Sequence, residues 1–343
     1  MTIKLFIKKL LLFSIPFVAF VLLYFYFDPF KVVRSYNCYY ESGKPSYITL
    51  NKDYVSTENW VNRQGQYHFD SYIFGNSRSM FYPVGVWKNY IGADSEQCYH
   101  FDASAESIYG IARKLSFLAA HGAPVRNALF IIDASALNKA DNSAGHIFVK
   151  DPRLSGESRV SFQVDFLKDF FDFDFLRALL DFKLTGRIKD YMKRDFLLDD
   201  RPFFYDSVTN EIRMDFYEDM IGKDTGAYYT PRADLFYDRD MSVQKSYPPV
   251  IKTPQLALLR TIKKVLDGDG TNYKIVISPL YDQLKLNPAD LRVLQDVFGP
   301  QHIFDFSGIN DFTRSRYNYY EASHYRPQIA DSIMRIIYAP PAR

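Results

Sequence analysis

The chain has 343 residues, which is long for a single domain, although α/β folds of about 200 to 300 residues are common as single units. Its hydrophobic content of 47% is ordinary for a globular protein and is enough to bury a sizeable core. The net charge of +2 excludes the strongly basic composition typical of nucleic-acid-binding proteins, so no nucleic acid is expected as a partner. The 27 Tyr and 30 Phe can stack on sugar rings or simply pack in the core.

An apolar segment near the N-terminus predicts a membrane anchor. Leu10 to Phe27 (LLLFSIPFVAFVLLYFYF) contains no charged residue, and a helix needs about 20 mostly apolar residues to cross the hydrocarbon core of a bilayer. Lys4, Lys8 and Lys9 precede this segment, which places the N-terminus in the cytoplasm and everything after Asp28 outside. A cleaved signal peptide is the alternative, but no small-x-small cleavage site follows the run. We therefore expect residues 1–28 to form a cytoplasmic stub and a single transmembrane helix.

The two cysteines leave two interpretations open. In an oxidising compartment Cys38 and Cys98 can pair, whereas sequence alone does not show that their side chains meet. Two buried free thiols are the alternative.

The remainder of the chain is organised as alternating short apolar runs and amphipathic segments. Residues 29–69 show no clear period and are interpreted as a connector packed on the domain, which spans residues 70–343. The predicted strands are 71–74, 98–101, 128–132, 273–277 and 302–306, and the predicted helices are one capped by Ser104 and those at 253–268, 287–299 and 327–338. This alternation indicates a three-layer α/β/α fold with a flavodoxin-like parallel sheet. Residues from about 138 to 250 interrupt the pattern and are interpreted as an insertion covering the site.

A serine follows the first predicted strand, where this architecture places its ligands. Ser77 lies in Gly75-Asn76-Ser77-Arg78, and parallel sheets bind ligands beyond the carboxyl ends of their strands. A turn there exposes the hydroxyl, and N–H groups at a following helix start can hold an oxyanion. A simple turn with a serine helix cap is the alternative.

A histidine before the last helix completes the pattern. His324 lies in Tyr320-Glu321-Ala-Ser-His324-Tyr325, and a serine nucleophile needs such a base within hydrogen-bond reach. The base in turn needs a carboxylate to fix its tautomer. Glu321 lies three residues earlier, so one turn of loop or helix can bring the two side chains together.

These two segments resemble the SGNH/GDSL hydrolase superfamily. The similarity rests on Ile73-Phe-Gly-Asn-Ser-Arg78 and Tyr319-Tyr-Glu-Ala-Ser-His-Tyr325, and covers residues 70 to 340 apart from the insertion. It is nearest to membrane-anchored SGNH-like proteins of bacterial surface-polysaccharide loci, such as those of alginate acetylation and teichoic-acid alanylation. The resemblance implies Ser77 as nucleophile, His324 as general base and Glu321 as orienting acid.

The resemblance also implies the residues around the nucleophile. The Ser77 N–H would be one oxyanion donor, and the turn at Ser104 and Ala105 a second, where the family usually has Gly. Asn76 and Arg78 flank the nucleophile as further candidate oxyanion or substrate-binding residues. Arg78 can pair with an anionic substrate group or form an internal salt bridge.

The chain departs from the family pattern in two places. The usual acid is Asp, and Glu321 is one methylene longer. The usual Gly-x-Asn-Asp block should follow the third strand, but Asp133-Ala134-Ser135 stands there, and an ionised Asp133 cannot donate a hydrogen bond. Gly308-Ile-Asn-Asp311 spells the motif after the last strand and is interpreted as a coincidence.

The resulting expectation is a serine-dependent acyl-ester hydrolase or O-acyltransferase acting on cell-surface or exported polysaccharide. It would be anchored in the bacterial inner membrane through residues 10–27, with its domain in the periplasm. An acylated polysaccharide or acyl donor and a membrane acyl carrier are the expected partners. The remaining histidines show no metal spacing, and no nucleotide-binding motif is present, so no cofactor is expected. The alternative is a catalytically inactive glycan-binding or assembly protein.

Overall fold

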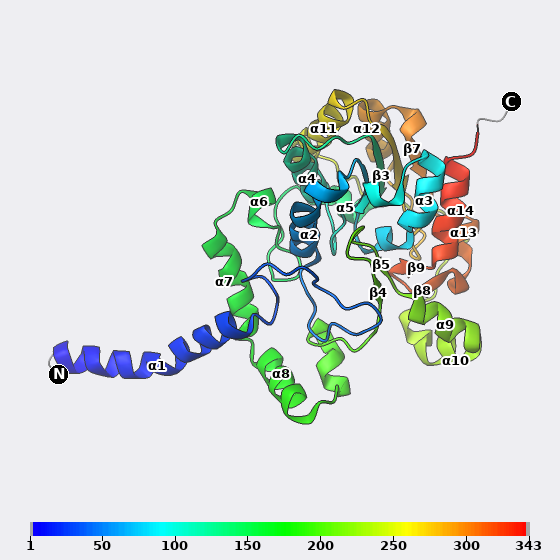
Figure 1. The fold of residues 1–343 in the computed structure, drawn as a ribbon. Helices are drawn as coiled ribbons and strands as arrows, with labels where there is room; N and C mark the ends of the chain where they lie inside the picture. The colour runs from blue at the N-terminus through cyan, green and yellow to red at the C-terminus, as the bar shows by residue number, and fades with distance from the viewer. Residues whose placement is uncertain (1–2, 341–343) are drawn as a thin grey trace.

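A long N-terminal helix projects from the rest of the molecule in the computed structural model, which describes residues 3–340 (Figure 1). The first two residues of the predicted anchor and the last three of the predicted domain lie outside this range. The helix, α1 (Ile3–Phe27), exposes almost all of its large apolar side chains. It is long enough and apolar enough to cross a membrane.

The centre of the domain is a five-stranded sheet in which every neighbouring pair is parallel. Its strands are β1 (Ser71–Gly75), β2 (Cys98–His100), β3 (Asn127–Ile132), β6 (Asn272–Ile277) and β7 (Ile303–Asp305), in the order β2-β1-β3-β6-β7. This is the order of flavodoxin-like sheets, whose ligands bind where the order reverses, between β1 and β3. The predicted mixed α/β fold with a parallel sheet is confirmed.

Helices cover both faces of the sheet because alternate strand residues point to opposite sides. Phe74 and Phe130 face a core that also contains residues of α4 (Ile108–Ala120), α11 (Thr253–Gly268) and α12 (Pro288–Phe298). Ile73 and Ile131 face a second core shared with α3 (Val84–Ile91) and α14 (Pro327–Ile337). Both faces are therefore buried, which explains why the strands read as continuous apolar runs.

Two helices differ from the sequence prediction. The cap of α4 is Ser107, whose hydroxyl accepts the N–H of Gly110, and not Ser104 as predicted, because Ser104 and Ala105 form a separate turn before the helix. The region predicted as a connector contains α2 (Lys52–Tyr67), a helix of 16 residues. Its buried positions include Lys52, Asp53 and other polar side chains, so it lacks the apolar period by which helices are recognised.

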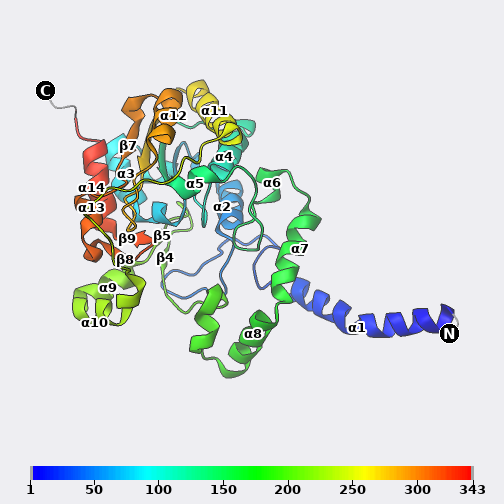
Figure 2. The same ribbon diagram turned by 180° about the vertical axis from the view of Figure 1, so that it is seen from behind.

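The segment interpreted as an insertion surrounds the domain on more than one side (Figures 1 and 2). It follows α5 (Ala134–Asn138) and contains α6 (Pro152–Ser155), α7 (Arg159–Phe170), α8 (Phe173–Thr185), β4 (Phe204–Tyr205), β5 (Ile212–Arg213), α9 (Asp215–Lys223) and α10 (Thr225–Tyr229). Helices α7 and α8 lie beside the base of α1, whereas α9 and α10 lie beside the hairpin of β8 (Tyr319–Glu321) and β9 (His324–Tyr325). Short α13 (Asp311–Arg314) precedes this hairpin, and 3-10 helices lie at 77–81, 95–97, 190–196, 230–235, 300–302 and 316–318.

The two cysteines do not form a disulfide. Cys38 is exposed and Cys98 is buried in β2, and both are free thiols. The structure therefore does not contain the disulfide that the sequence left open. The alternative of two buried free thiols holds only in part, because both thiols are free but only Cys98 is buried.

Candidate active site

Ser77 lies directly beyond the carboxyl end of β1, next to β3. The strand ends at Gly75, and Asn76 caps a 3-10 helix of which Ser77 is the first residue. A Cβ atom at Gly75 would lie 2.6 Å from the carbonyl oxygen of Ile131, so only glycine lets the two strands approach this closely. The glycine therefore allows the turn that carries Ser77 to form against β3.

The structure brings Ser77 together with the predicted histidine and acid. Ser77 Oγ lies 2.7 Å from His324 Nε2, and His324 Nδ1 is hydrogen-bonded to Glu321 Oε1. A carboxylate only accepts hydrogen bonds, so Nδ1 carries the proton and Nε2 presents its lone pair to the Ser77 hydroxyl. Glu321 and His324 are paired across the β8–β9 hairpin, which is a different geometry from the loop or helical turn considered from the sequence.

Glu321 is held in its ionised form by its neighbours. Burial raises its pKa, but hydrogen bonding and charge attraction from His324, together with the N–H of Ser323 at 2.8 Å from Oε2, lower it below its ordinary value. The carboxylate is therefore negatively charged at neutral pH and can stabilise a protonated His324. The ring of Phe81 packs edge-on against His324 at 6.0 Å between centroids and helps to hold the imidazole in place.

Asp133 organises the loop that carries the nucleophile. Its Oδ2 accepts hydrogen bonds from Asn76 Nδ2 at 2.7 Å and from Arg78 Nη1 at 2.6 Å. Its Oδ1 caps α5 by accepting the N–H groups of Ser135 and Ala136. Burial raises the pKa of Asp133, but Arg78 and these hydrogen bonds together lower it below its ordinary value. Asp133 is thus an ionised acceptor, as expected from the sequence, and has no proton to offer an oxyanion.

Arg78 and Asn76 both have structural partners. The Arg78 side chain forms the internal salt bridge with Asp133, which was one of its two interpretations, and its Nε donates to the carbonyl oxygen of Ser323 at 2.9 Å. Asn76 Oδ1 accepts the Arg78 N–H at 3.1 Å. Arg78 consequently connects the Ser77 loop to the hairpin turn beside His324, which helps to fix the distance between Ser77 and His324.

The predicted oxyanion turn lies at the same edge of the sheet. The Ala103 N–H donates to the Gly75 carbonyl oxygen at 3.2 Å, so the segment after β2 runs beside the segment after β1. Ala105 is exposed and has a φ of 48°, a left-handed conformation that costs an L-residue about 1 kcal/mol and that glycine adopts freely. Donation from Ser104 or Ala105 to a substrate stays a prediction.

A buried cluster of charges lies beneath this turn. Lys114, fully buried on α4, contacts Glu106 at 2.6 Å and Asp53 of α2 at 3.2 Å. Two further lysines complete the cluster, with contacts Lys52–Asp102 at 2.6 Å, Lys150–Asp53 at 3.0 Å and Lys150–Glu106 at 2.5 Å. Buried charges need such pairing because isolated ones are very costly. This cluster was not predicted from the sequence, although Lys114, a lysine among the apolar positions of α4, was a signal for it.

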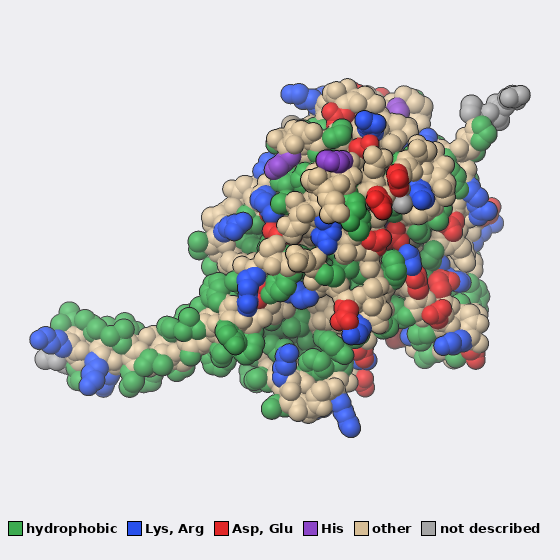
Figure 3. All heavy atoms as spheres, viewed as in Figure 1, with side chains coloured by type: hydrophobic (Ala, Val, Ile, Leu, Met, Phe, Trp, Pro, Cys, Tyr) green, Lys and Arg blue, Asp and Glu red, His purple; other side chains and the backbone are tan. Residues whose placement is uncertain are grey.

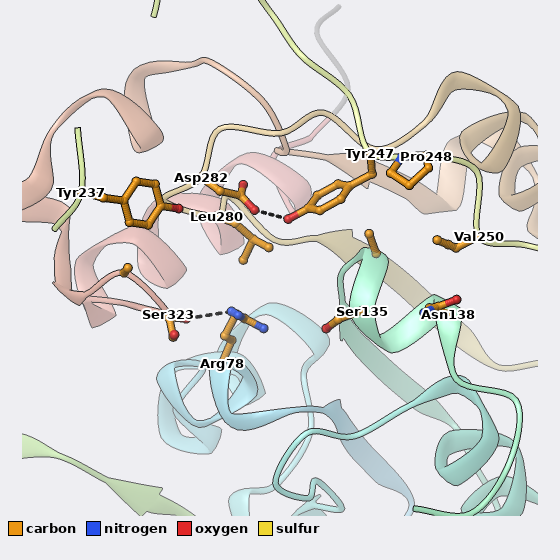
Figure 4. Close-up of a pocket in the computed structure, with 12 residues that line it drawn as sticks. Arg78, Ser135, Asn138, Tyr237, Tyr247, Pro248, Val250, Leu280, Asp282 and Ser323 are labelled. Atoms are coloured by element: carbon orange, nitrogen blue, oxygen red, sulfur yellow. Dashed lines mark hydrogen bonds between the residues drawn. The ribbon is translucent and has the colours of Figure 1, made fainter. Parts of the chain in front are cut away.

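A pocket of about 490 Å³, drawn in Figure 4, is lined by residues next in sequence to Ser77 and His324 but not by Ser77 or His324 themselves. Arg78 and Ser323, the sequence neighbours of Ser77 and His324, form one side. The other lining residues come from the segments after β3 and β6 and from the end of the insertion, namely Ala134, Ser135, Asn138, Leu280, Asp282, Tyr237, Tyr247, Pro248 and Val250, with Ala322 beside Ser323. Tyr247 donates to Asp282, and burial raises its pKa. The insertion thus reaches the pocket through its last residues, which sequence reasoning did not single out.

The segment Gly308-Ile-Asn-Asp311 has a structural role. Asn310 caps α13, and its side-chain amide donates to the carbonyl oxygens of Phe306 and Gly308. This segment follows β7, whereas Ser77 follows β1. Within residues 3–340 there is no group of three His, Cys, Asp or Glu side chains that could hold a metal ion.

Comparisons with known proteins do not identify a relative. No protein-family model matches the chain, and no curated protein matches it closely enough to indicate a relationship.

Proposed function

We propose that this protein is a membrane-anchored serine esterase or O-acyltransferase of the SGNH/GDSL type. The observation that carries the proposal is the chain of hydrogen bonds from Ser77 through His324 to Glu321 at the carboxyl edge of a parallel sheet. A nucleophile, a base and an orienting acid in this arrangement are the requirements of acyl transfer through a covalent intermediate. Helix α1 would hold the domain on the periplasmic side of a bacterial inner membrane.

The mechanism follows from the positions of these atoms. Ser77 Oγ attacks the acyl carbon of an ester while His324 Nε2 accepts its proton, and the charge of Glu321 stabilises the resulting imidazolium. The tetrahedral intermediate collapses, the leaving alkoxide takes the proton from His324, and Ser77 remains acylated. A water molecule or a sugar hydroxyl, deprotonated by His324, then attacks the acyl-serine, and His324 returns the proton to Ser77 Oγ as the ester bond to Ser77 breaks. Water yields hydrolysis and a sugar hydroxyl yields acyl transfer.

A glycan substrate is supported by the composition of the pocket. Tyr237 and Tyr247 provide aromatic surfaces, and Asn138, Ser135 and Asp282 provide hydrogen-bonding groups around a volume of about 490 Å³. Aromatic faces combined with amide and carboxylate groups suit the apolar ring faces and hydroxyl groups of sugars. An anchor on the membrane would place this pocket where exported polysaccharide passes.

A second candidate function is glycan binding without catalysis. The observation that favours it is Asp133, which is ionised and fully committed to Asn76, Arg78 and α5. The related position of the SGNH pattern carries an asparagine that can donate to the oxyanion. A site with one donor fewer would bind a glycan in the same pocket without turning over its esters.

Covalent labelling of the full-length chain with a serine-reactive fluorophosphonate distinguishes the two functions. We expect labelling of the wild type and of Ser161→Ala, which removes an exposed serine of α7, and none of Ser77→Ala or His324→Ala. A parallel reaction with the smaller phenylmethylsulfonyl fluoride controls for exclusion of the probe by the insertion. Failure of both reagents to modify the folded wild type would overturn the catalytic proposal. Glycan binding that survives in Ser77→Ala without any adduct in the wild type would support the second function.

A further inference from the structure

Helices α7 and α8 expose a set of large apolar side chains. On α8, Phe173, Leu180 and Leu184 are 76%, 58% and 85% exposed, and their spacing of seven and four residues places them on one face of the helix. On α7, Val160 and Val164 are exposed and are also four residues apart. Single exposed apolar residues are normal on a protein surface, but an aligned stripe on two consecutive helices indicates a contact surface.

This surface is continuous with the membrane-anchor helix. The ring of Phe171, between α7 and α8, stacks on Phe17 of α1 at 5.3 Å between centroids and contacts Phe20 at 6.2 Å. Tyr24 of α1 is fully buried and donates a hydrogen bond of 2.6 Å to Gln163 of α7. The turn between the two helices is therefore packed against the second half of α1.

The position of this turn along α1 sets its position in a membrane. Phe17 lies ten residues before Phe27, which corresponds to about 15 Å of helix. The intervening apolar side chains, such as Leu22 and Phe25, remain exposed on the other sides of α1 and need a lipid environment. If this half of α1 is in lipid, the α7–α8 turn at its side has to be at the level of the same leaflet.

The directions of the helices fit a surface lying on a bilayer. Both views show α7 and α8 running across the base of α1, and not alongside its length (Figures 1 and 2). Hydrophobic side chains cover α1 and continue onto the adjoining part of the domain over α8 (Figure 3). A helix that crosses the direction of the anchor in this way lies roughly in the plane of the membrane.

The charged side chains limit how deep the helices can lie. Asp172 caps α8 and Asp174 is exposed in its first turn, so both carboxylates need water or headgroups. Lys183 and Arg187 are exposed near the end of α8, where basic groups favour anionic phospholipid headgroups. This combination of an apolar stripe and flanking basic residues is typical of helices at the membrane interface.

We infer that α7 and α8 form a second membrane contact, within the leaflet nearest the C-terminal end of α1, with the stripe of Phe173, Leu180 and Leu184 facing the acyl chains. The inference depends on α1 entering a bilayer and does not depend on the proposed serine chemistry. Two contacts instead of one would fix the orientation of the domain, and with it the direction in which the pocket opens relative to the membrane.

Spin-label accessibility in lipid nanodiscs tests this inference on the full-length chain. Cys38→Ser removes the exposed thiol, and single labels are then placed at Phe173→Cys and Leu184→Cys. Leu12→Cys on α1 is the control for lipid, and Ile336→Cys, an apolar position on α14 that is 51% exposed, is the control for water. In nanodiscs containing phosphatidylglycerol, we expect the labels at positions 173, 184 and 12 to be more accessible to oxygen than to a water-soluble nickel chelate, and the label at position 336 to show the reverse.

Two results would overturn the inference. Labels at positions 173 and 184 that behave like the label at position 336 would show that the surface faces water. Labels shielded from both reagents would show that another protein chain, such as a second copy, covers the surface. Neither result depends on serine labelling, so failure of the membrane contact and failure of the catalytic proposal are separable.

Discussion

Replacing Glu321 by glutamine tests the proposed triad most directly, because it removes one charge and leaves the size of the side chain unchanged. Glu321 Oε2 accepts the N–H of Ser323, a requirement that the glutamine oxygen would meet. The amide nitrogen would then face His324 Nδ1 and donate to it, which moves the imidazole proton to Nε2. In that tautomer His324 no longer has a lone pair for the Ser77 hydroxyl, so the base is lost.

The size of the effect follows from the exposure of the pair. A fully buried carboxylate in this position of a serine triad contributes about 10⁴-fold to turnover. The side chains of Glu321 and His324 are each 32% exposed, so water partly replaces the lost charge and allows the productive tautomer to be populated. We therefore expect a loss of about 10²- to 10³-fold, which corresponds to about 3 to 4 kcal/mol in the activation free energy.

The assay is the second-order rate constant for fluorophosphonate labelling of the full-length chain at neutral pH. Glu157→Gln, which removes an exposed carboxylate outside the site, is the matched control and should label at the rate of the wild type. The urea midpoints of both variants show whether the fold is intact. A labelling rate of Glu321→Gln within about twofold of the wild type would refute the assignment of Glu321, since about 0.4 kcal/mol is too little for a triad member.

Three further predictions concern the support of the site. Because the pKa of Asp133 is lower in the folded state than in the unfolded state, its charge stabilises the fold above its ordinary pKa, and this contribution is lost as the pH falls through the folded value. Asp133→Asn should therefore lower the urea midpoint at pH 7 and make it fall less steeply in acid; an unchanged acid profile would contradict this. Gly75→Ala should lower the free energy of unfolding by about 1 to 3 kcal/mol and slow serine labelling, because the new Cβ would meet the Ile131 carbonyl oxygen. An unchanged free energy of unfolding in urea would be evidence against this close contact. Burial raises the pKa of Cys98 to about 12, so a thiol reagent should modify only Cys38 in the native protein and both cysteines in urea. Modification of both thiols in the native protein would show that β2 is accessible to the reagent.

Much of the fold could be predicted because its signals are local. The strands at the centre of the sheet are buried on both faces and appear as apolar runs. Helices α11, α12 and α14 repeat their apolar residues with the helical period and have proline in their first turn. Helix α2 could not be predicted in this way. Its buried face contains Lys52, whose partner Asp102 follows β2, and Asp53, whose partners lie in α4 and in the insertion.

The candidate site shows the same division. Ser77 and His324 could be selected from short segments at a strand end and before a helix, but they are separated by 247 positions in the chain. That their side chains meet depends on the packing of the β8–β9 hairpin against the Ser77 loop and on the contacts of Arg78 with Asp133 and Ser323. None of these contacts leaves a periodic pattern in the sequence.

By itself, the sequence determined the apolar N-terminal helix, the strands of the central sheet and the residues of the proposed triad, because hydropathy, periodicity and turn residues act over a few neighbouring positions. Only the tertiary structure decided that Asp133 accepts hydrogen bonds from the nucleophile loop, that the cysteines stay apart, and that the end of the insertion lines the pocket. These features arise where segments distant in the chain pack together. The free energy of a buried charge or a hydrogen bond there depends on the partner that folding brings to it.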